Sequence, residues 1–435
     1  MKLTRYQKFA VAVLAFLQFT IVLDFMILAP LGATLLPQLH VSPSQFSLVV
    51  SVYAFSAGAS GLLTAGFADK FDRKKLLLFF YCGFILGTVL CGIAPDYHFL
   101  LAARIVAGLF GGVIGSISMA ITADLFPLEM RGRVMGVIQT AFAASQVLGL
   151  PVGLLLSNRW GWHAPFLMIA GIGAAVGVVI ALKLKPIDAH LKVKNDRNAF
   201  QHLVKTISKP AYLRAFGATI FLTTGGFMLM PFSSAFTVNN LGIPIEKLPL
   251  IYLVTGACSI VAGPLVGRLS DSIGKYPVFC LGTALSIIMV TIYCHLGVTP
   301  LWAVILVSVL LFIGISARMV SVSALISAVP DLKDRGAFMS VNSSVQQFAG
   351  GVASGIAGLI VVQTQSGKMS HYDLLGYVVI TAMAITVALM YSIHKMVKEK
   401  ADSGPAASVA RGADPKPAID GQGLRDEMTH SDYAS

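Results

Sequence analysis

The chain has 435 residues, of which 56% are hydrophobic and only 12% carry a charge, and its mean hydropathy is +0.79. Because soluble domains carry about 25% charged residues, this composition excludes a water-soluble globule and indicates a membrane protein. The net charge of +12 fits a membrane protein with a basic cytoplasmic face and does not indicate a nucleic-acid partner. All five cysteines lie in apolar segments, so we expect no disulfide framework, metal site or cofactor.

Twelve apolar segments follow along the chain, each long enough to cross a hydrocarbon core that needs about 20 residues. They occupy residues 9–36, 45–66, 76–94, 99–122, 133–156, 164–184, 211–238, 248–268, 277–296, 301–328, 337–362 and 373–395. The first is too long for a signal peptide and lacks a convincing cleavage site, so we interpret it as a membrane helix. The sequence therefore predicts an all-α membrane protein with twelve spanning helices.

Six helices fall in each half of the chain. We expect an N-terminal bundle over residues 1–184 and a C-terminal bundle over residues 211–398. The basic connection 185–210 is predicted to be a cytoplasmic linker. The segment 399–435 is rich in Gly, Ala, Pro and Asp, and is predicted to be a disordered cytoplasmic tail.

Basic residues give the orientation. If the N-terminus is cytoplasmic, only Arg159, Lys247 and Lys368 among the 32 Lys and Arg residues lie in outer segments. The positive-inside rule then places both termini in the cytoplasm. We expect a monomeric, multi-pass protein of the bacterial inner membrane whose basic face contacts anionic lipids.

A charged motif between the second and third segments recurs about 200 residues later. The first copy, 65–75, reads AGFADKFDRKK, and the second, 267–275, reads GRLSDSIGK. Arg131-Gly132 and Arg335-Gly336 repeat at nearly the same offset. A repeat of this length, dense in apolar segments, is typical of a duplicated membrane protein.

On these residues the chain resembles the major facilitator superfamily, whose loop motif reads G-x-x-x-D-[RK]-x-G-[RK]-[RK]. The second copy matches at Gly267, Asp271, Gly274 and Lys275. The first keeps Asp69, Lys70, Arg73 and Lys74, but Ala65 and Asp72 replace the two glycines. The resemblance covers roughly residues 5–398 and implies two pseudo-symmetric six-helix bundles around a central cavity.

Three charged side chains lie well inside the predicted helices: Asp24, Arg104 and Arg318. Each costs about 2.5–3.5 kcal/mol at mid-membrane, so each needs a compensating role. Asp24, the sole carboxylate in a helix core, is either a proton-coupling site or a permanent structural salt bridge or cap. Arg318 has two open roles: contact with an anionic substrate group, or with the helix-1 carboxylate across the cavity.

Arg104 opens the run R-x-x-x-G, followed at helical spacing by small residues that allow close helix approach. Its depth differs from that of Asp24 by roughly 7 Å at 1.5 Å per residue, within reach of an arginine. The pattern resembles the fourth-helix motif of proton-coupled facilitators, in which an arginine serves a first-helix carboxylate. The alternative is that Arg104 snorkels to the outer headgroups.

Other polar side chains in the helices should face a wet cavity or a neighbouring helix, because lipid contact is costly. The expected substrate cavity comprises Thr20, Gln139, Gln146, Thr223, Thr224, Arg318, Asn342 and Gln346. By resemblance, loop charges form a cytoplasmic gate in which Asp69 meets the helix near Gly336 and Asp271 the helix near Gly132. The expected gate comprises Asp69, Arg73, Lys74, Glu129, Arg131, Asp271, Lys275 and Arg335. The alternative is that this cluster only fixes the topology.

These features predict secondary active transport of a small organic solute by alternating access, and neither an enzyme nor an ATP-driven pump. Gly274-Lys275 is followed by Tyr276, which does not complete a phosphate-binding loop, and the histidines show no helical i, i+4 pair. Resemblance to the twelve-helix drug:proton antiporters favours proton-coupled efflux of drug-like or metabolite compounds. The fifth-helix stretch ASQVLGLPVG lacks their G-P pair, so a proton symporter or uniporter for a sugar, organic anion or lysolipid is the alternative.

Overall fold

The computed structural model describes residues 3–64, 71–188, 191, 207–331 and 334–402. The gate residue Asp69, most of the linker and the segment 403–435 lie outside the described residues, as does the side chain of Glu129. The helix that ends the described chain continues to Asp402, past residue 399 where the predicted tail begins.

The first half of the chain is helical throughout. Its elements are α1 (Arg5–Ile27), α2 (Gly32–Gln38), α3 (Pro43–Thr64), α4 (Arg73–Gly92), α5 (Tyr97–Leu125), α6 (Leu128–Ala144), the π-helical turn η2 (Ser145–Gly149), α7 (Leu150–Trp160) and α8 (His163–Lys183).

The second half repeats this order. Its elements are α10 (Pro210–Leu229), the 3-10 turn η4 (Met230–Phe232), α11 (Ser233–Asn239), the 3-10 turn η5 (Ile245–Lys247), α12 (Leu248–Ile273), α13 (Lys275–His295), α14 (Leu301–Ala328), α15 (Arg335–Ile360), β1 (Val362–Gln363), β2 (Met369–Ser370) and α16 (Tyr372–Asp402). The two strands form a small antiparallel hairpin between the last two helices.

Eleven helical segments of the described chain are long and apolar enough to cross a membrane. The remaining predicted span, 337–362, corresponds to α15, which has 26 residues but falls outside that group. It carries Asn342, Gln346 and Gln347 among small residues, and these polar side chains lower its hydropathy. The predicted all-α membrane fold with twelve spanning helices is confirmed.

Two predicted spans are broken where one continuous helix was expected. The span 9–36 is divided into α1 and α2 around Pro30, and the span 211–238 into α10, η4 and α11 around Pro231. Proline lacks the N–H that the carbonyl four residues earlier needs, and its ring clashes with that carbonyl. The two breaks lie side by side, because the Ser234 hydroxyl donates to the carbonyl of Ala29 at 2.9 Å.

The predicted fifth span is also irregular. It consists of α6, η2 and α7, and the π turn lies immediately before Pro151. A π turn accommodates an extra residue within a helix and is frequent at functional sites. Here the buried Ser145 hydroxyl lies within hydrogen-bond distance of the carbonyls of Ala141 and Phe19, at 2.9 and 3.0 Å, which ties the irregular turn to α1.

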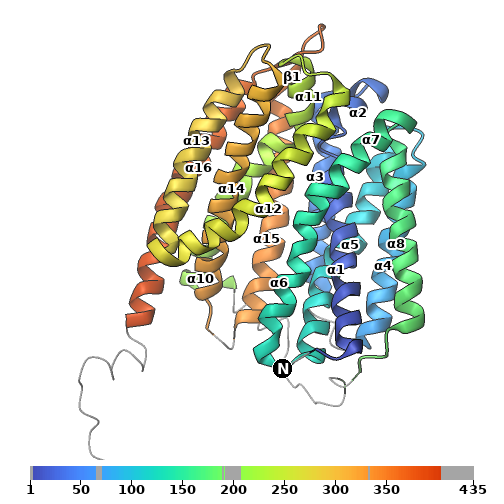
Figure 1. Cartoon of the computed structure of the whole chain (residues 1–435), viewed down its shortest axis with the longest axis vertical. Coiled ribbons are helices and arrows are strands. Elements are labelled where there is room, and N and C mark those ends of the chain that lie inside the picture. The colour runs from blue at the N-terminus through green and yellow to red at the C-terminus, as the bar shows by residue number, and fades with distance from the viewer. Residues whose placement is uncertain (1–2, 65–70, 189–190, 192–206, 332–333, 403–435) are drawn as a thin grey trace, which may run out of the picture.

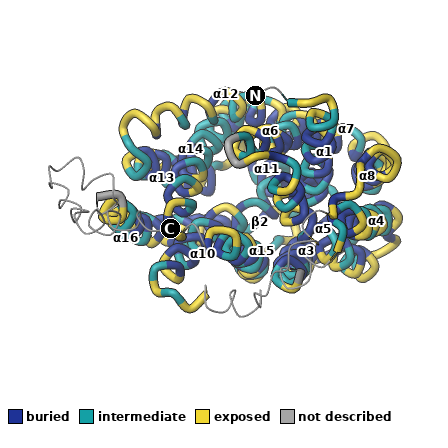
Figure 2. The backbone as a smooth tube through the Cα atoms, turned by 90° about the horizontal axis from the view of Figure 1, so that it is seen from below, coloured by how far each residue is buried: buried dark blue, intermediate teal, exposed yellow. Residues whose placement is uncertain are grey.

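The helices form two bundles, α1 to α8 and α10 to α16 (Figures 1 and 2). The terminal end of the molecule is the end where α1 begins and α16 ends; α2, α11 and the hairpin lie at the opposite, distal end (Figure 1). Close packing of α3 on α15 joins the bundles, since the Ser51 hydroxyl donates to the carbonyl of Gly351 at 2.8 Å. On the other side, Gly256 of α12 packs against Val147 of η2. Toward the terminal end α12 and α6 diverge (Figure 1).

Candidate substrate cavity and buried ion pair

A buried ion pair connects α1 and α5 in the first bundle. Arg104 Nη1 donates to Asp24 Oδ2 at 2.8 Å, and both residues are 0% exposed. The hydroxyl of Thr88 on α4 donates to the other carboxylate oxygen at 3.2 Å. The Arg104 guanidinium also lies 4.2 Å from the ring centroid of Tyr53 on α3. Arg104 therefore turns inward onto Asp24 instead of toward the membrane surface.

Glycines explain how three helices approach this pair closely. A Cβ on Gly108 would lie 2.5 Å from the carbonyl oxygen of Tyr53, and one on Gly112 would lie 2.4 Å from that of Ala57. Only small residues permit such contact between helix backbones. Because Gly108 is one turn after Arg104, the same face of α5 presents the arginine to α1 and the glycines to α3.

A cavity of about 280 Å³ lies between the two bundles. Residues of α1, α6 and η2 contribute one wall, and α10, α12 and α14 contribute most of the rest. The lining is mainly apolar and includes Met26, Phe142, Leu222, Phe227, Tyr252, Leu311, Phe312, Met319 and Met383. Among the described lining residues, Arg318 is the sole charged one.

Four predicted cavity residues line this space: Gln146, Thr223, Arg318 and Gln346. The other four are not among its described lining residues. The buried Thr20 hydroxyl donates to the carbonyl of Leu17 at 2.9 Å and contacts the hydroxyl of Tyr81 at 3.2 Å. Asn342 accepts a hydrogen bond from Thr219 at 2.7 Å. Thr224 donates to the carbonyl of Ile220 at 2.9 Å, and Gln139 is exposed.

Sequence reasoning missed several lining residues, among them Tyr252, Ser308 and Met383. Tyr252 precedes Thr255, which also lines the cavity, by three residues, so one face of α12 presents both. Once one lining residue is known, helical spacing finds its neighbours. Aliphatic and aromatic side chains give no such starting point, since they suit lipid contact equally well.

Aromatic rings connect the ion pair to the cavity. Tyr53, beneath the Arg104 guanidinium, lies 5.5 Å from Phe25 between ring centroids. Phe25 lies 5.6 Å from Phe227, which belongs to α10 of the other bundle and lines the cavity. Asp24 and Arg104 are themselves absent from the described lining, so the pair and the cavity are separate sites in contact through these rings.

The predicted gate residues of the first bundle bind groups of that same bundle. Arg73 pairs with Asp124 of α5 at 3.4 Å, and the Lys74 ammonium donates to the carbonyl of Ala181 at 2.9 Å. The Arg131 guanidinium donates to the carbonyl of Ala123 at 2.7 Å and to that of Phe126 at 2.9 Å. These contacts hold the loops at the terminal end of the bundle.

The two loop motifs begin their following helices differently. In the second copy Gly274 has φ of 101°, a conformation that favours glycine, and Lys275 forms an ion pair with Asp271 one turn earlier. In the first copy Asp72 replaces this glycine and its carboxylate accepts a hydrogen bond from the backbone of Lys75 at 3.0 Å. The departure from the family motif thus provides an N-cap for α4. Arg335 is exposed at the first residue of α15.

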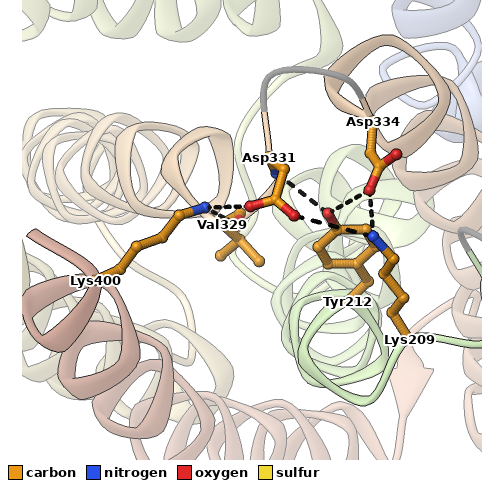
Figure 3. Close-up of polar contacts among 6 residues, drawn as sticks. All are labelled: Lys209, Tyr212, Val329, Asp331, Asp334 and Lys400. Carbon is orange, nitrogen blue, oxygen red and sulfur yellow. Dashed lines mark hydrogen bonds and ion pairs between the residues drawn. The ribbon is translucent and has the colours of Figure 1, made fainter. Parts of the chain in front are cut away.

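A polar cluster that sequence reasoning missed lies at the terminal end of the second bundle (Figure 3). Lys209 pairs with Asp334, and the hydroxyl of Tyr212 donates to the same carboxylate at 3.0 Å. Lys400, near the end of α16, donates to Asp331 at 2.9 Å. The Lys400 hydrogen bond and charge lower the pKa of Asp331, and the hydrogen bond to Asp334 raises the pKa of Lys209. The cluster ties the first turn of α10 and the end of α16 to the loop before α15.

A match to a protein-family model identifies the family of this chain. The model of the Major Facilitator Superfamily matches residues 14–233 and 215–425. The chain belongs to this superfamily. It is therefore a multi-pass membrane transporter and not an enzyme, and as a transporter it has a small-molecule substrate.

Two similar relatives do not narrow the substrate, because both are uncharacterized transporters. This chain is similar to the uncharacterized MFS-type transporter YbcL of Bacillus subtilis (strain 168). The two are 27% identical over 336 residues, which cover 77% of this chain and 82% of YbcL. This chain is 26% identical over 270 residues to the uncharacterized MFS-type transporter YceJ of the same organism, covering 61% and 68%.

Solved structures share the fold. A bacterial homologue of the human lysosomal transporter Spinster, in an inward-facing and unoccupied conformation, superposes with a TM-score of 0.69 at 15% identity, covering 91% of this chain and 97% of that one. Its inward-facing and occupied form gives 0.67 at 14% identity, covering 93% and 99%. At this identity the likeness shows the fold alone.

Proposed function

We propose that this transporter couples proton movement to the export of drug-like or metabolite compounds across a bacterial inner membrane, as drug:proton antiporters do. The observation that carries the proposal is the Asp24–Arg104 pair, fully buried and held at 2.8 Å. Asp24 can take up a proton and become neutral, whereas the guanidinium of Arg104 stays charged at any accessible pH. A change of protonation can therefore break the ion pair only by neutralising Asp24.

A broken pair must rearrange, because a buried guanidinium without a counter-ion is costly. Arg104 would turn further onto Tyr53 or toward water, and Tyr53 contacts Phe25, which meets Phe227 at the cavity wall. Proton uptake by Asp24 is thus proposed to change how the first bundle packs against the second. The alternative is that the pair is permanent and only fixes the packing of α1 on α5.

We further propose that the terminal end is cytoplasmic and that this conformation opens toward it. The distribution of basic residues supports this orientation. Contacts of α2 with α11, and of Gly256 with Val147, cover the cavity at its distal side. Residues 1–184 and 211–398 are proposed to be the two moving bundles of a monomer, and the loop charges to close the cytoplasmic entrance in the opposite state.

Export of lipophilic compounds is supported by the apolar lining of the cavity, which offers few groups to a sugar. Uptake of an organic anion by symport or uniport is the second candidate function, because Arg318 gives the cavity one positive charge. Both candidates share the same cavity and differ in whether substrate binding displaces a proton.

Proton release on substrate binding tests the proposal. Purified protein in lipid nanodiscs, in weak buffer with a pH-sensitive dye, would receive 1-naphthylacetate, ethidium or glucose. We expect at least one compound to release protons from the parent protein and to bind Asp24→Asn without release. The double variant Asp24→Asn/Arg104→Gln removes both charges and is the folded comparison. Substrate binding to the parent without proton release, or equal release from the double variant, would show that the pair is structural.

A further inference from the structure

We propose that Arg318 forms an oxyanion subsite, and that the substrate is an organic anion: a carboxylate or phosphate monoester carried on an apolar body. This inference rests on the proposed function only in so far as the cavity binds the transported compound. It depends on neither the direction of transport nor proton coupling at Asp24.

The first observation is that Arg318 is buried without a counter-ion. Its side chain is 3% exposed, and its Nε and Nη2 atoms have no hydrogen-bond partner among the described residues. Buried polar groups are normally hydrogen-bonded and buried charges are normally paired. Arg104, at a similar burial, has both Asp24 and the ring of Tyr53. Arg318 therefore lacks the counter-ion that Arg104 has, although the Nε of Arg104 is also without a partner.

The second observation excludes the obvious internal partner. The remaining candidate was the carboxylate of Asp24 across the cavity, but Arg104 and Thr88 already bind its two oxygens. Among the described residues that line the cavity, none is an aspartate or glutamate. The positive charge of Arg318 is left for a group that enters the cavity.

The third observation is that the local packing fixes Arg318 and places a glycine, which has no side chain, next to its Nη1 atom. A Cβ on Gly282 of α13 would lie 3.2 Å from the backbone nitrogen of Arg318, so α14 is held closely against α13 at this point. On the cavity side, Nη1 lies 3.8 Å from the Cβ position of Gly225 on α10. Because α10 has glycine at 225 and 226, no side chain from these positions covers the guanidinium.

The chemistry of the rest of the lining defines the other part of the ligand. A guanidinium binds carboxylate or phosphate through two parallel N–H···O bonds, which gives it preference over a neutral amide. Around it the cavity presents aromatic, aliphatic and methionine side chains, with Thr223 and Gln346 as neutral polar groups. A sugar would leave most of its hydroxyls unpaired here, and a cation would meet a like charge. An amphiphilic anion would pair its charge with Arg318 and bury its apolar body against the rest of the lining.

Four probes of one aromatic body separate charge from shape: 1-naphthylacetate, 1-naphthyl phosphate, 1-naphthylacetamide and 1-naphthylmethylammonium. Dissociation constants would be measured by calorimetry in nanodiscs of neutral lipid. We expect at least one anion to bind ten-fold or more tighter than the amide, and the cation to bind weakest. Tighter binding of the carboxylate points to organic acids, and tighter binding of the phosphate points to phosphate monoesters.

Two variants complete the test. Arg318→Gln should reduce anion affinity ten-fold or more and leave amide affinity unchanged, whereas Arg214→Gln, a change at an exposed arginine of α10, should leave all four constants unchanged. Arg318→Gln should also raise the midpoint of thermal unfolding, because it removes an unpaired buried charge. Equal binding of amide and anions, failure of both anions to bind, or lower thermal stability of Arg318→Gln would overturn the proposal. The same binding series in Asp24→Asn/Arg104→Gln separates this outcome from a failure of proton coupling.

Discussion

Removing the charge of Asp24 while Arg104 stays in place should strongly destabilise the folded protein. Deleting one partner of a buried ion pair costs about 3–5 kcal/mol, because the other charge is left in a low-dielectric site. Arg104 would keep the ring of Tyr53 at 4.2 Å, a contact worth about 2 kcal/mol when desolvated. We therefore expect Asp24→Asn to lose about 3 kcal/mol, at the lower end of that range.

The reverse change should cost less. In Arg104→Gln the carboxyl of Asp24 can become neutral by taking up a proton and keeps its hydrogen bond from Thr88. The neutral carboxyl group then lacks part of its hydrogen bonding, which costs about 1–3 kcal/mol of stability. In Asp24→Asn/Arg104→Gln two neutral amides face each other, so we expect a loss of about 2 kcal/mol, roughly 3 kcal/mol less than the sum of the single changes.

Unfolding in mixed micelles with increasing SDS, followed by circular dichroism and extrapolated to zero SDS, gives the four free energies of this cycle. Each variant would be measured at one pH and one lipid composition. A loss below about 1 kcal/mol for Asp24→Asn, together with additive effects in the double variant, would refute the reasoning, because two buried charges that pair with each other cannot behave independently.

Three further predictions concern packing, conformation and pH. Gly112→Ala should destabilise the protein by about 1–3 kcal/mol in the same assay, because the added Cβ would meet the α3 backbone at 2.4 Å. Gly256→Ala should weaken the packing of α12 on η2 and change the rate of transport into liposomes, because the added Cβ would lie 3.0 Å from the Cα of Val147. Because Lys400 lowers the pKa of Asp331, their pair contributes stability above pH about 4 that is lost as the pH falls through the lowered value, so Lys400→Met should reduce the acid sensitivity of the unfolding midpoint.

Each of these has a matched comparison. Gly115→Ala on the same helix meets nothing within 4 Å and should be neutral or stabilising, since alanine favours helix by up to about 1 kcal/mol. Gly263→Ala, also on α12, meets nothing within 4 Å and should leave transport unchanged, whereas an unchanged rate for Gly256→Ala would contradict the proposed role of this contact. Lys395→Met, which removes an exposed pair with Glu399, should keep the parent pH dependence.

The charges inside apolar segments were the most informative part of the sequence. Asp24 and Arg104 could be proposed as a pair from the sequence because helix geometry converts sequence position into depth, and their difference in depth of roughly 7 Å is within reach of an arginine side chain. The helix breaks at Pro30 and Pro231 were missed, since the apolar run continues across each proline and only the backbone reveals the interruption. Four of the eight residues that the sequence predicted to line the cavity do line it. Asn342, for example, is satisfied by Thr219, because rotation of a helix about its axis depends on packing partners that are far away in sequence.

The cluster around Asp334 shows a different limit. Lys209 and Asp331 are more than a hundred residues apart, and Lys400 follows Asp331 by 69 residues. Charges in the loops at this end of the protein are too numerous for pairing to be inferred from spacing. The N-cap formed by Asp72 was likewise unexpected. The family motif has glycine at that position, so from the sequence alone the aspartate indicates only a departure from the motif.

The separation of the Asp24–Arg104 pair from the cavity has a consequence for how tightly proton movement and substrate movement would be coupled. When a proton and a substrate compete for one carboxylate, each expels the other by direct exclusion, and the exchange ratio is fixed by stoichiometry. Here the carboxylate belongs to one bundle and the vacant guanidinium of Arg318 to the cavity wall of the other, with Tyr53, Phe25 and Phe227 between them. Under the proposed coupling both ligands could be bound at once, so the ratio of protons to substrate would be set by the relative free energies of the conformations.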